Sequence, residues 1–272
     1  MQPLVNIALR AARRAGQIIV RSMDRVHTLT IEEKGKNDFV SEIDRAAEAA
    51  IIDTILHIYP DHAILGEESG ALETDSSHTW IIDPLDGTMN FLQGIPHFSI
   101  SIGIKVGGTL EHGVIVDPVR NEEFLASRGH GAQLNGKRIR VTSGTKLDRS
   151  IVATGIPYRQ LEDHLDAYSE ILTRLTASCR SIRRMGSAAL DLAYLAAGRT
   201  DGLFHVGISP WDMAAGTVIV REAGGFVGDI AGGDRFMDTG NLVAGNPRIF
   251  REMMKVIRSA TADAGDTVLA RG

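Results

Sequence analysis

The sequence lacks the features that mark several large classes of protein. Cys179 is the only cysteine, which excludes an internal disulfide, a cysteine zinc ribbon and an iron–sulfur cluster. A single cysteine is also typical of a reducing cytoplasm, and we expect the protein to be cytoplasmic. No apolar run approaches the roughly 18 residues of a membrane span. Arg10, Arg13 and Arg14 interrupt the N-terminal segment before the apolar region of a signal peptide could form, so we expect no membrane association.

Positive charge is scarce as well. The 34 Asp and Glu residues outnumber the 29 Lys and Arg residues, and the net charge is −5. A bulk charge of this sign argues against direct binding of nucleic acid. The remaining composition is that of an ordinary globular protein, with 43% hydrophobic and 23% charged residues in a chain of 272. A chain of this length can bury a large core and is expected to form one domain with two lobes, or two domains.

The first half of the chain has the pattern of an α+β lobe. Helical spacing of apolar residues predicts two helices, at residues 1–25 and 42–58. Alternating apolar residues and two-residue turns, Gly107-Gly108 and Asn135-Gly136, predict an antiparallel sheet. Its clearest strands lie at residues 98–106, 109–117 and 123–127. We predict an N-terminal α+β lobe over residues 1–145.

The second half changes to an alternation of short apolar runs and helical patterns. The predicted strands lie at residues 151–154, 202–205, 225–230 and 242–244. The predicted helices lie at residues 162–176, 187–197, 210–223 and 247–259. This alternation is typical of a layered α/β structure. We therefore predict a C-terminal α/β lobe over residues 146–272.

The densest group of polar residues lies at 80–91, which reads Trp-Ile-Ile-Asp-Pro-Leu-Asp-Gly-Thr-Met-Asn-Phe. An apolar strand ends at Asp83, a proline forces a turn, and Asp86 follows, so the two carboxylates can converge on one point. Carboxylate and carbonyl oxygens are the ligands that Mg²⁺ prefers. A helix that starts at Gly87-Thr88 would add free N–H groups beside the metal. A metal next to an anion site suggests phosphate.

Each acidic residue also has a purely structural explanation. Aspartates are common in turns because their side chains bond to nearby N–H groups. Glu67 lies in a loop that could be solvated. Asp44 could complete a capping box with Ser41, and Asp212 could do the same in a helix that starts at Pro210. A carboxylate at the start of a helix can serve both as a cap and as a ligand.

In combination, these segments resemble the inositol monophosphatase family, in its bacterial branch. Five segments match the family in order and spacing: Gly66-Glu-Glu-Ser69, residues 80–91, Trp211-Asp-Met-Ala-Ala-Gly216, residues 37–44 and Gly186-Ser-Ala188. The resemblance implies a five-layered αβαβα sandwich. It also implies Mg²⁺-dependent, Li⁺-sensitive hydrolysis of a small phosphomonoester by metal-activated water, usually in a homodimer. Inositol 1-phosphate is the first expected substrate.

The resemblance implies two metal positions. Glu67, Asp83 and the Leu85 carbonyl match the ligands of the first Mg²⁺. Asp83, Asp86 and Asp212 match the ligands of the second. The N-terminal lobe would then carry most of the metal ligands, and the C-terminal lobe would carry Asp212 and the substrate contacts.

The resemblance also implies catalytic and substrate-binding roles. Asp44 and Thr88 match the pair that polarises the attacking water, and Glu67 counts with them as catalytic. Lys34 matches a lysine near the catalytic loop. The residues matched to phosphate and substrate are Asp86, Gly87, Thr88, Gly186, Ser187, Ala188, His205 and Asp212.

One position departs from the family pattern. Relatives commonly have an acidic residue in the segment that here reads Gly202-Leu-Phe-His-Val-Gly207, and that acid contacts inositol hydroxyls. Here His205 replaces it, which bears on the substrate and not on the chemistry. The alternative interpretation of His205 is an exposed histidine at the end of a strand.

Two other functions stay open. A related phosphatase could act on a sugar bisphosphate or a nucleotide, and it would need a basic rim for which Arg183-Arg184 is the nearby candidate. Some bacterial relatives are associated with RNA polymerase and ribosomal-RNA transcription, so a transcription-machinery partner could coexist with catalysis.

Overall fold

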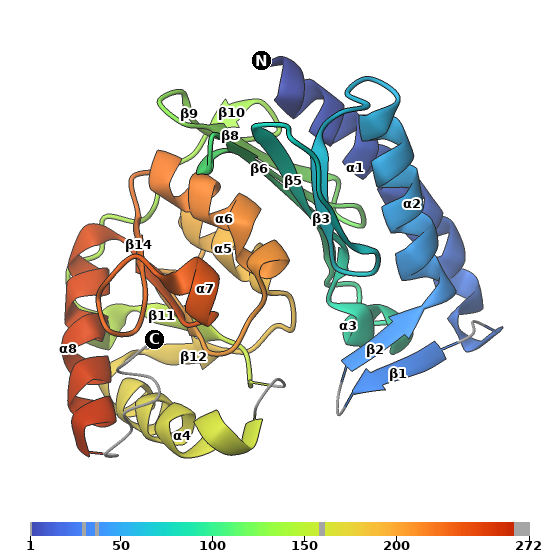
Figure 1. Cartoon of the computed structure of the whole chain (residues 1–272). Coiled ribbons are helices and arrows are strands. Elements are labelled where there is room, and N and C mark those ends of the chain that lie inside the picture. The colour runs from blue at the N-terminus through green and yellow to red at the C-terminus, as the bar shows by residue number, and fades with distance from the viewer. Residues whose placement is uncertain (1, 29–30, 36–37, 158–160, 264–272) are drawn as a thin grey trace.

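The computed structural model describes residues 2–28, 31–35, 38–157 and 161–263. Figure 1 shows five layers, in which pairs of helices alternate with two sheets. The helix layers are formed by α1 (Pro3–Ser22) with α2 (Glu42–Leu56), α5 (Ala188–Ala196) with α6 (Pro210–Glu222), and α4 (Leu161–Ser178) with α8 (Pro247–Asp263). The predicted αβαβα sandwich is therefore confirmed. Among these helices, none is both long and apolar enough to cross a bilayer.

The larger sheet has eight strands in the order β10-β9-β8-β7-β6-β5-β3-β4. These strands are β3 (Ala63–Gly66), β4 (Gly70–Leu72), β5 (His78–Asp86), β6 (Ser99–Val106), β7 (Thr109–Asp117), β8 (Glu122–Ser127), β9 (Gly131–Leu134) and β10 (Lys137–Arg138). The predicted antiparallel pairing of β6, β7 and β8 is confirmed, and the sheet also contains a parallel pair, β3 with β5, that was not predicted. After β3 the chain turns back and forms β4 antiparallel to it at the edge of the sheet. It then enters β5 on the other side of β3, with the start of β5 beside the start of β3.

Both predicted hairpin turns are present. Gly107 and Gly108 have φ of 57° and 81°, and Asn135 and Gly136 have φ of 49° and 75°. Paired positive φ values are those of the tight turns that match strand twist. A further hairpin, of β1 (Ile31–Gly35) and β2 (Asp38–Ser41), forms a separate two-stranded sheet and was not predicted.

The smaller sheet has the order β12-β11-β13-β15-β14. Its strands are β11 (Ile151–Thr154), β12 (Ser181–Arg183), β13 (Gly202–His205), β14 (Phe226–Gly228) and β15 (Leu242–Gly245). Parallel pairs join β11 to β12 and β13, and antiparallel pairs complete the sheet. The short elements are η1 (Met23–Thr28), α3 (Thr88–Leu92), η2 (Leu147–Arg149) and α7 (Phe236–Thr239). The predicted α/β alternation is confirmed, although β12 and α7 were not predicted.

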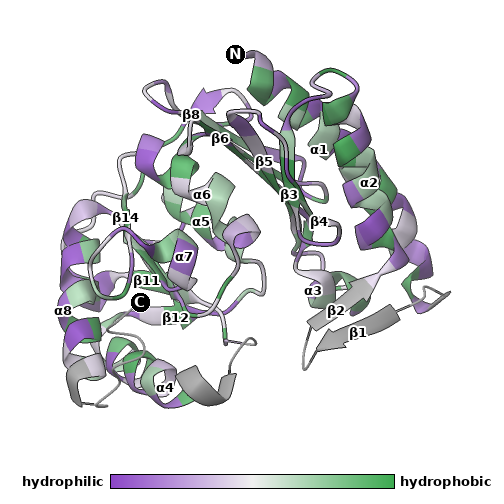
Figure 2. Ribbon diagram, viewed as in Figure 1, coloured by the Kyte–Doolittle hydropathy of each residue, from purple (hydrophilic) through white to green (hydrophobic). Residues whose placement is uncertain are grey.

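Three hydrophobic cores fill the spaces between the layers, and Figure 2 shows apolar residues on the facing sides of the elements. The middle core contains Ile115 from the large sheet, Leu192 from α5 and Leu203 from the small sheet. Both predicted lobes therefore contribute to one buried cluster. The exact boundary between residues 145 and 146 stays a prediction.

The helix α6 lies directly on the large sheet because two strands carry glycine where it crosses them. A Cβ atom at Gly103 would lie 2.6 Å from the Ala214 Cβ. A Cβ atom at Gly113 would lie 2.3 Å from the Ala215 carbonyl oxygen. Any side chain at either position would push the helix outward. This close contact brings the first turn of α6, with Asp212, next to the end of β5.

Candidate active site

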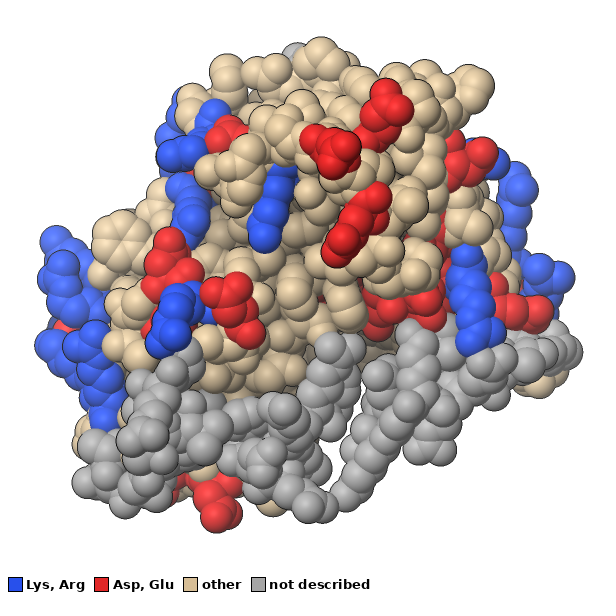
Figure 3. Space-filling view, viewed as in Figure 1, with Lys and Arg blue, Asp and Glu red and all other residues tan. Residues whose placement is uncertain are grey.

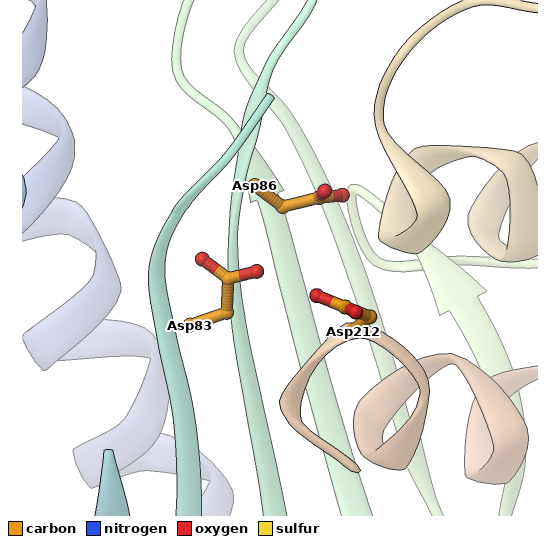
Figure 4. A group of neighbouring side chains, drawn as sticks. All are labelled: Asp83, Asp86 and Asp212. Atoms are coloured by element: carbon orange, nitrogen blue, oxygen red, sulfur yellow. The ribbon is translucent and has the colours of Figure 1, made fainter. Parts of the chain in front are cut away.

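Asp83, Asp86 and Asp212 bring their carboxylates together where β5 meets the start of α6 (Figure 4). Each offers an oxygen, and these oxygens all lie within 4.8 Å of one another. The three residues are only 1%, 9% and 6% exposed. The expected convergence of Asp83 and Asp86 is present, and a residue more than a hundred positions later joins them.

A bulge in β5 places the first two carboxylates on one face. Asp83 pairs with Ser101 and Asp86 with Ser99, so three steps along β5 match two along β6. In a regular strand, residues three apart point to opposite faces, and one extra residue cancels that alternation. The proline between them cannot donate a ladder hydrogen bond, which suits a bulge. The Leu85 N–H also donates to Asp83 Oδ1 at 3.0 Å.

Without a cation, the buried carboxylates of the cluster repel one another. Burial, the nearby charges of Glu67, Asp86 and Asp212, and a hydrogen bond with Glu67 raise the pKa of Asp83 well above its usual range. Burial and the charge of Asp212 raise the pKa of Asp86 to about 7. Buried carboxylates that repel one another are the donor set that a hard divalent cation stabilises. The residues therefore fit the metal that the resemblance implies.

These shifts predict how pH affects the stability of the metal-free protein. The folded pKa of Asp86, about 7, exceeds its ordinary value of 3.8, so the folded state binds more protons between these values. The extra bound proton stabilises the folded protein fully at pH values below 3.8, the pKa of Asp86 in the unfolded chain. This stabilisation is lost as the pH rises toward 7. We expect Mg²⁺ to raise the Tm by about 5 °C or more at pH 8, and by less at pH 5. Thermal melts at both pH values, with and without Mg²⁺, measure this; an equal or larger gain at pH 5 would contradict it.

Asp44 and Thr88 form a hydrogen-bonded pair beside the cluster. Asp44 lies in the first turn of α2, where the predicted capping box is confirmed: the Ser41 N–H donates to Asp44 Oδ2 at 2.9 Å. The Thr88 hydroxyl donates to Asp44 Oδ1 at 2.9 Å and lies 3.0 Å from the Leu85 carbonyl oxygen. Burial raises the pKa of Asp44, and hydrogen bonds from Ser41 and Thr88 oppose that change. Both carboxylate oxygens of Asp44 are thus held in fixed directions.

Gly87 is the N-cap of the short helix α3, so the predicted helix start is confirmed. Its φ of 101° is a conformation that other residues rarely adopt. A Cβ atom there would lie 3.1 Å from the carbonyl oxygens of both Gly186 and His97. Glycine therefore lets the loop before α5 cross closely over the end of β5.

The segment predicted to contact substrate lies directly on Asp86. The Ser187 hydroxyl donates to Asp86 Oδ2 at 2.5 Å, and the Ala189 N–H donates to the same oxygen at 2.7 Å. The Ala188 N–H lies 3.3 Å from Asp86 Oδ1. Asp86 thus accepts hydrogen bonds at the N-terminus of α5, where a negative charge is favoured. Contacts of Gly186, Ser187 and Ala188 with a substrate stay a prediction.

Glu48 supports the site, although it was not predicted from the sequence. It is 2% exposed, and its Oε1 accepts a hydrogen bond from the Glu68 N–H at 3.0 Å. The Glu67 N–H in turn donates to the Ile82 carbonyl at 3.1 Å, which aligns Glu67 with the end of β5. The available signal was an acidic residue one helical turn after Asp44 on a helix face that is otherwise apolar.

Asn90 is a second supporting residue that was not predicted from the sequence. Its Nδ2 donates to the His97 carbonyl at 2.7 Å and to the Met185 carbonyl at 2.8 Å. These two bonds join α3, the loop before β6 and the loop before α5. Asn90 thereby holds the Gly186–Ala188 segment against the carboxylate cluster.

His205 does not lie where the alternative interpretation placed it. It is 3% exposed, so the expectation of an exposed histidine is wrong. Its Nε2 lies 3.2 Å from Oδ2 of Asp191, which is itself 1% exposed. Burial raises the pKa of Asp191, and His205 opposes that change. A contact between His205 and substrate stays a prediction.

The side chain of Lys34, which was matched to a lysine near the catalytic loop, lies outside the described part of the chain.

A five-layered sandwich with a buried carboxylate cluster at the end of a bulged strand is the architecture of the metal-dependent phosphatases that the motifs resemble. The model of the inositol monophosphatase family matches residues 1–262. The chain belongs to the inositol monophosphatase family.

Known relatives match nearly the whole chain. Nus factor SuhB of Escherichia coli K12 is 51% identical over 265 residues, which cover 97% of this chain and 99% of that protein. The crystal structure of extragenic suppressor protein suhB from Bartonella henselae is 41% identical, with a TM-score of 0.91 over 94% of this chain and 99% of its own. The inositol monophosphate-bound structure of SaIMPase-II is 28% identical, with a TM-score of 0.80 over 96% of each chain. The similarity therefore extends over nearly the whole chain, including both sheets.

Proposed function

We propose that this protein is a Mg²⁺-dependent phosphatase of small phosphomonoesters, with inositol 1-phosphate as its first substrate. The observation that carries the proposal is the convergence of three buried carboxylates beside the Thr88–Asp44 hydrogen bond. The structure of a relative with bound inositol monophosphate supports the class of substrate.

The acidic residues of the site would hold the metal. Glu67, Asp83 and the Leu85 carbonyl would form one position, and Asp83, Asp86 and Asp212 the other. When bound, Mg²⁺ would supply positive charge that stabilises the negative charge on the reacting phosphate. The raised pKa values of Asp83 and Asp86 support this assignment, because a cation would offset the repulsion that raises them.

Thr88 and Asp44 would orient the attacking water. The Thr88 hydroxyl gives its proton to the hydrogen bond with Asp44, so its lone pairs stay available to accept a hydrogen bond from water. As water attacks phosphorus and the bond to the ester oxygen breaks, the proton of the water can pass to Thr88 while the proton of Thr88 passes to Asp44. The departing alkoxide then takes up a proton from solvent. The Gly87 and Thr88 N–H groups would bind the phosphate oxygens at the start of α3. Positioning and electrostatics then provide most of the rate acceleration.

A phosphate-release assay tests the proposed function. The purified protein is incubated with inositol 1-phosphate, glycerol 2-phosphate, an adenosine monophosphate and a sugar bisphosphate, each with Mg²⁺. We expect release from the monoesters, fastest from inositol 1-phosphate, and inhibition by Li⁺. Preferential hydrolysis of the bisphosphate would favour the related phosphatase instead. Arg183, which bonds only to Ser181 and Ile182 in the described part, would then be the cation to test. Release from none of these compounds would overturn the proposal.

Replacing Thr88 with alanine should lower kcat by about 100-fold and change KM little, because water is oriented mainly in the transition state. Thr88→Ser keeps the hydroxyl and is the matched control, which should retain most of the activity. Initial rates of phosphate release over a range of substrate concentrations measure both parameters. A rise in KM at unchanged kcat would show that Thr88 binds substrate and does not act on water.

Replacing His205 with glutamate should shift substrate preference. A carboxylate accepts charge-assisted hydrogen bonds from sugar hydroxyls, whereas a neutral imidazole accepts only one bond. Because Asp191 lies 3.2 Å from the imidazole, we pair the change with Asp191→Asn to avoid two adjacent carboxylates. We expect kcat/KM for inositol 1-phosphate relative to glycerol 2-phosphate to rise about tenfold. Asp191→Asn alone is the control, and an unchanged ratio would mean that His205 does not touch the substrate.

A second function, in the transcription machinery, has one specific observation in its favour. A relative that is 51% identical over nearly the whole chain is called a Nus factor. We infer that this protein also binds a protein of the transcription machinery. We further infer that it is a cytoplasmic homodimer. Tagged protein and its Asp83→Asn variant would be tested for binding to purified bacterial RNA polymerase, and light scattering would measure the oligomeric state. Binding by both proteins would separate this role from catalysis, and binding by neither would exclude a direct contact with the polymerase.

A further inference from the structure

A groove of about 380 Å³ lies between β14 and α8, at the end of α6 opposite to Asp212. Phe226 forms one wall and is 51% exposed, which is the largest exposed fraction among the large apolar side chains of the described residues. Phe226 packs edge-on against Phe250 with 6.0 Å between the ring centres, and Met254 lies one helical turn further on. The groove therefore has an apolar lining that is open to solvent and does not belong to the catalytic site.

A row of cations runs beside the apolar lining. Arg248, Arg251, Lys255 and Arg258 are all exposed, and their spacing of three and four residues places them on one face of α8. Figure 3 shows Lys and Arg gathered at the left edge of the molecule, where Figure 1 places α8. Phe250 and Met254 occupy the neighbouring face of the same helix. The groove is thus apolar on one side and positively charged on the other.

Few carboxylates offset this row. Lys255 pairs with Glu252 at 2.8 Å, and Arg258 reaches the Ala231 carbonyl at 3.4 Å. The guanidinium groups of Arg248 and Arg251 have no partner among the residues that the structure describes. Like charges three and four residues apart destabilise a helix. A positive stripe in a chain of net charge −5 is a local exception that an acidic partner would stabilise.

We propose that this groove binds a short acidic protein segment that carries an apolar anchor. The anchor would lie against Phe226, Phe250 and Met254, and the flanking carboxylates would pair with Arg251, Lys255 and Arg258. The row from Arg248 to Arg258 extends for about 15 Å along the helix, which matches about five residues of extended chain. The segment is therefore short and linear.

The observations favour a peptide over a nucleic acid. A polynucleotide continues beyond the row of cations and would face the negative charge of the rest of the chain, whereas a short segment feels only the local field within about 8 Å. The lining also combines an edge-to-face aromatic pair with a thioether. Such a lining suits an aliphatic or aromatic anchor better than a stack of bases.

The test uses the full chain and a fluorescein-labelled peptide, Glu-Asp-Phe-Leu-Glu-Asp, with anisotropy as the readout. We expect binding that weakens with salt and that weakens at least about tenfold in Arg251→Glu/Lys255→Glu and in Phe226→Ser. The matched control is Lys137→Glu/Arg138→Glu, which reverses two exposed charges on β10 and should bind as the wild type does. Thermal melts and circular dichroism show that each variant is folded.

Peptide and nucleic-acid controls separate the outcomes. A peptide with Ser in place of Phe-Leu, and one with Lys in place of the acids, should each bind at least tenfold more weakly. No binding of the acidic peptide, or equal binding by wild type and both groove variants, would overturn the proposal. Tighter binding of labelled hexauridylate, lost in Arg251→Glu/Lys255→Glu, would overturn it in favour of RNA. The proposal does not depend on the phosphatase activity, since no groove residue lies in the candidate active site.

Discussion

Asp83→Asn is expected to lower phosphate release by about 1,000-fold or more, because we propose that Asp83 contributes to both metal positions. Its carboxylate is surrounded by the charges of Glu67, Asp86 and Asp212, and an amide keeps its shape while removing its charge. The same change should raise the Tm of the metal-free protein, because it removes one of the mutually repelling groups. Rates at saturating Mg²⁺ and melts in EDTA measure the two effects.

The combination of lost activity and gained stability separates a functional role from a structural one. Asp229→Asn is the matched control, since Asp229 is also buried, at 4% exposure, and accepts hydrogen bonds from the Gly233 and Arg235 N–H groups. That variant should lose stability and keep its turnover per folded molecule. An Asp83→Asn protein with turnover within tenfold of the wild type would contradict the assignment of Asp83.

Removal of the metal should abolish phosphate release while the fold persists. The three cores are built from apolar side chains on both faces of the sheets and do not depend on the carboxylate cluster. Excess EDTA should therefore reduce the rate to the background level, and added Mg²⁺ should restore it. Circular dichroism in EDTA should retain the helical signal. Full activity in excess EDTA would exclude a metal-dependent mechanism.

Much of the fold follows from local signals in the sequence. The period-two alternation of β6 and the Gly107-Gly108 turn are enough to predict the hairpin with β7, since strand faces and tight turns depend on neighbouring residues. The parallel pairing of β3 with β5 could not be predicted in this way. It depends on how the β4 excursion packs at the edge of the sheet, and nothing in the apolar pattern of Ala63–Gly66 determines its partner.

The site likewise has some features that follow from local sequence and others that depend on tertiary packing. The convergence of Asp83 and Asp86 could be inferred from their spacing across a proline turn, and the capping role of Asp44 from its spacing to Ser41. Glu48 and Asn90 were missed because their partners lie on other elements. A hydrogen bond from Asn90 to the Met185 carbonyl joins residues that are 95 positions apart. The burial of His205 against Asp191 is equally a result of tertiary packing.

Gly103 and Gly113 have a consequence for how this protein can change during evolution. They set the distance between α6 and the large sheet, and Asp212 belongs to α6 whereas Asp83 belongs to the sheet. A single methyl group on either strand would move one half of the carboxylate cluster away from the other without altering any ligand. Sequence drift at these two positions is therefore constrained by the geometry of a site that neither glycine touches. Substitutions that improve packing elsewhere in the middle layer would preserve the site only if they leave the distance between α6 and the large sheet unchanged.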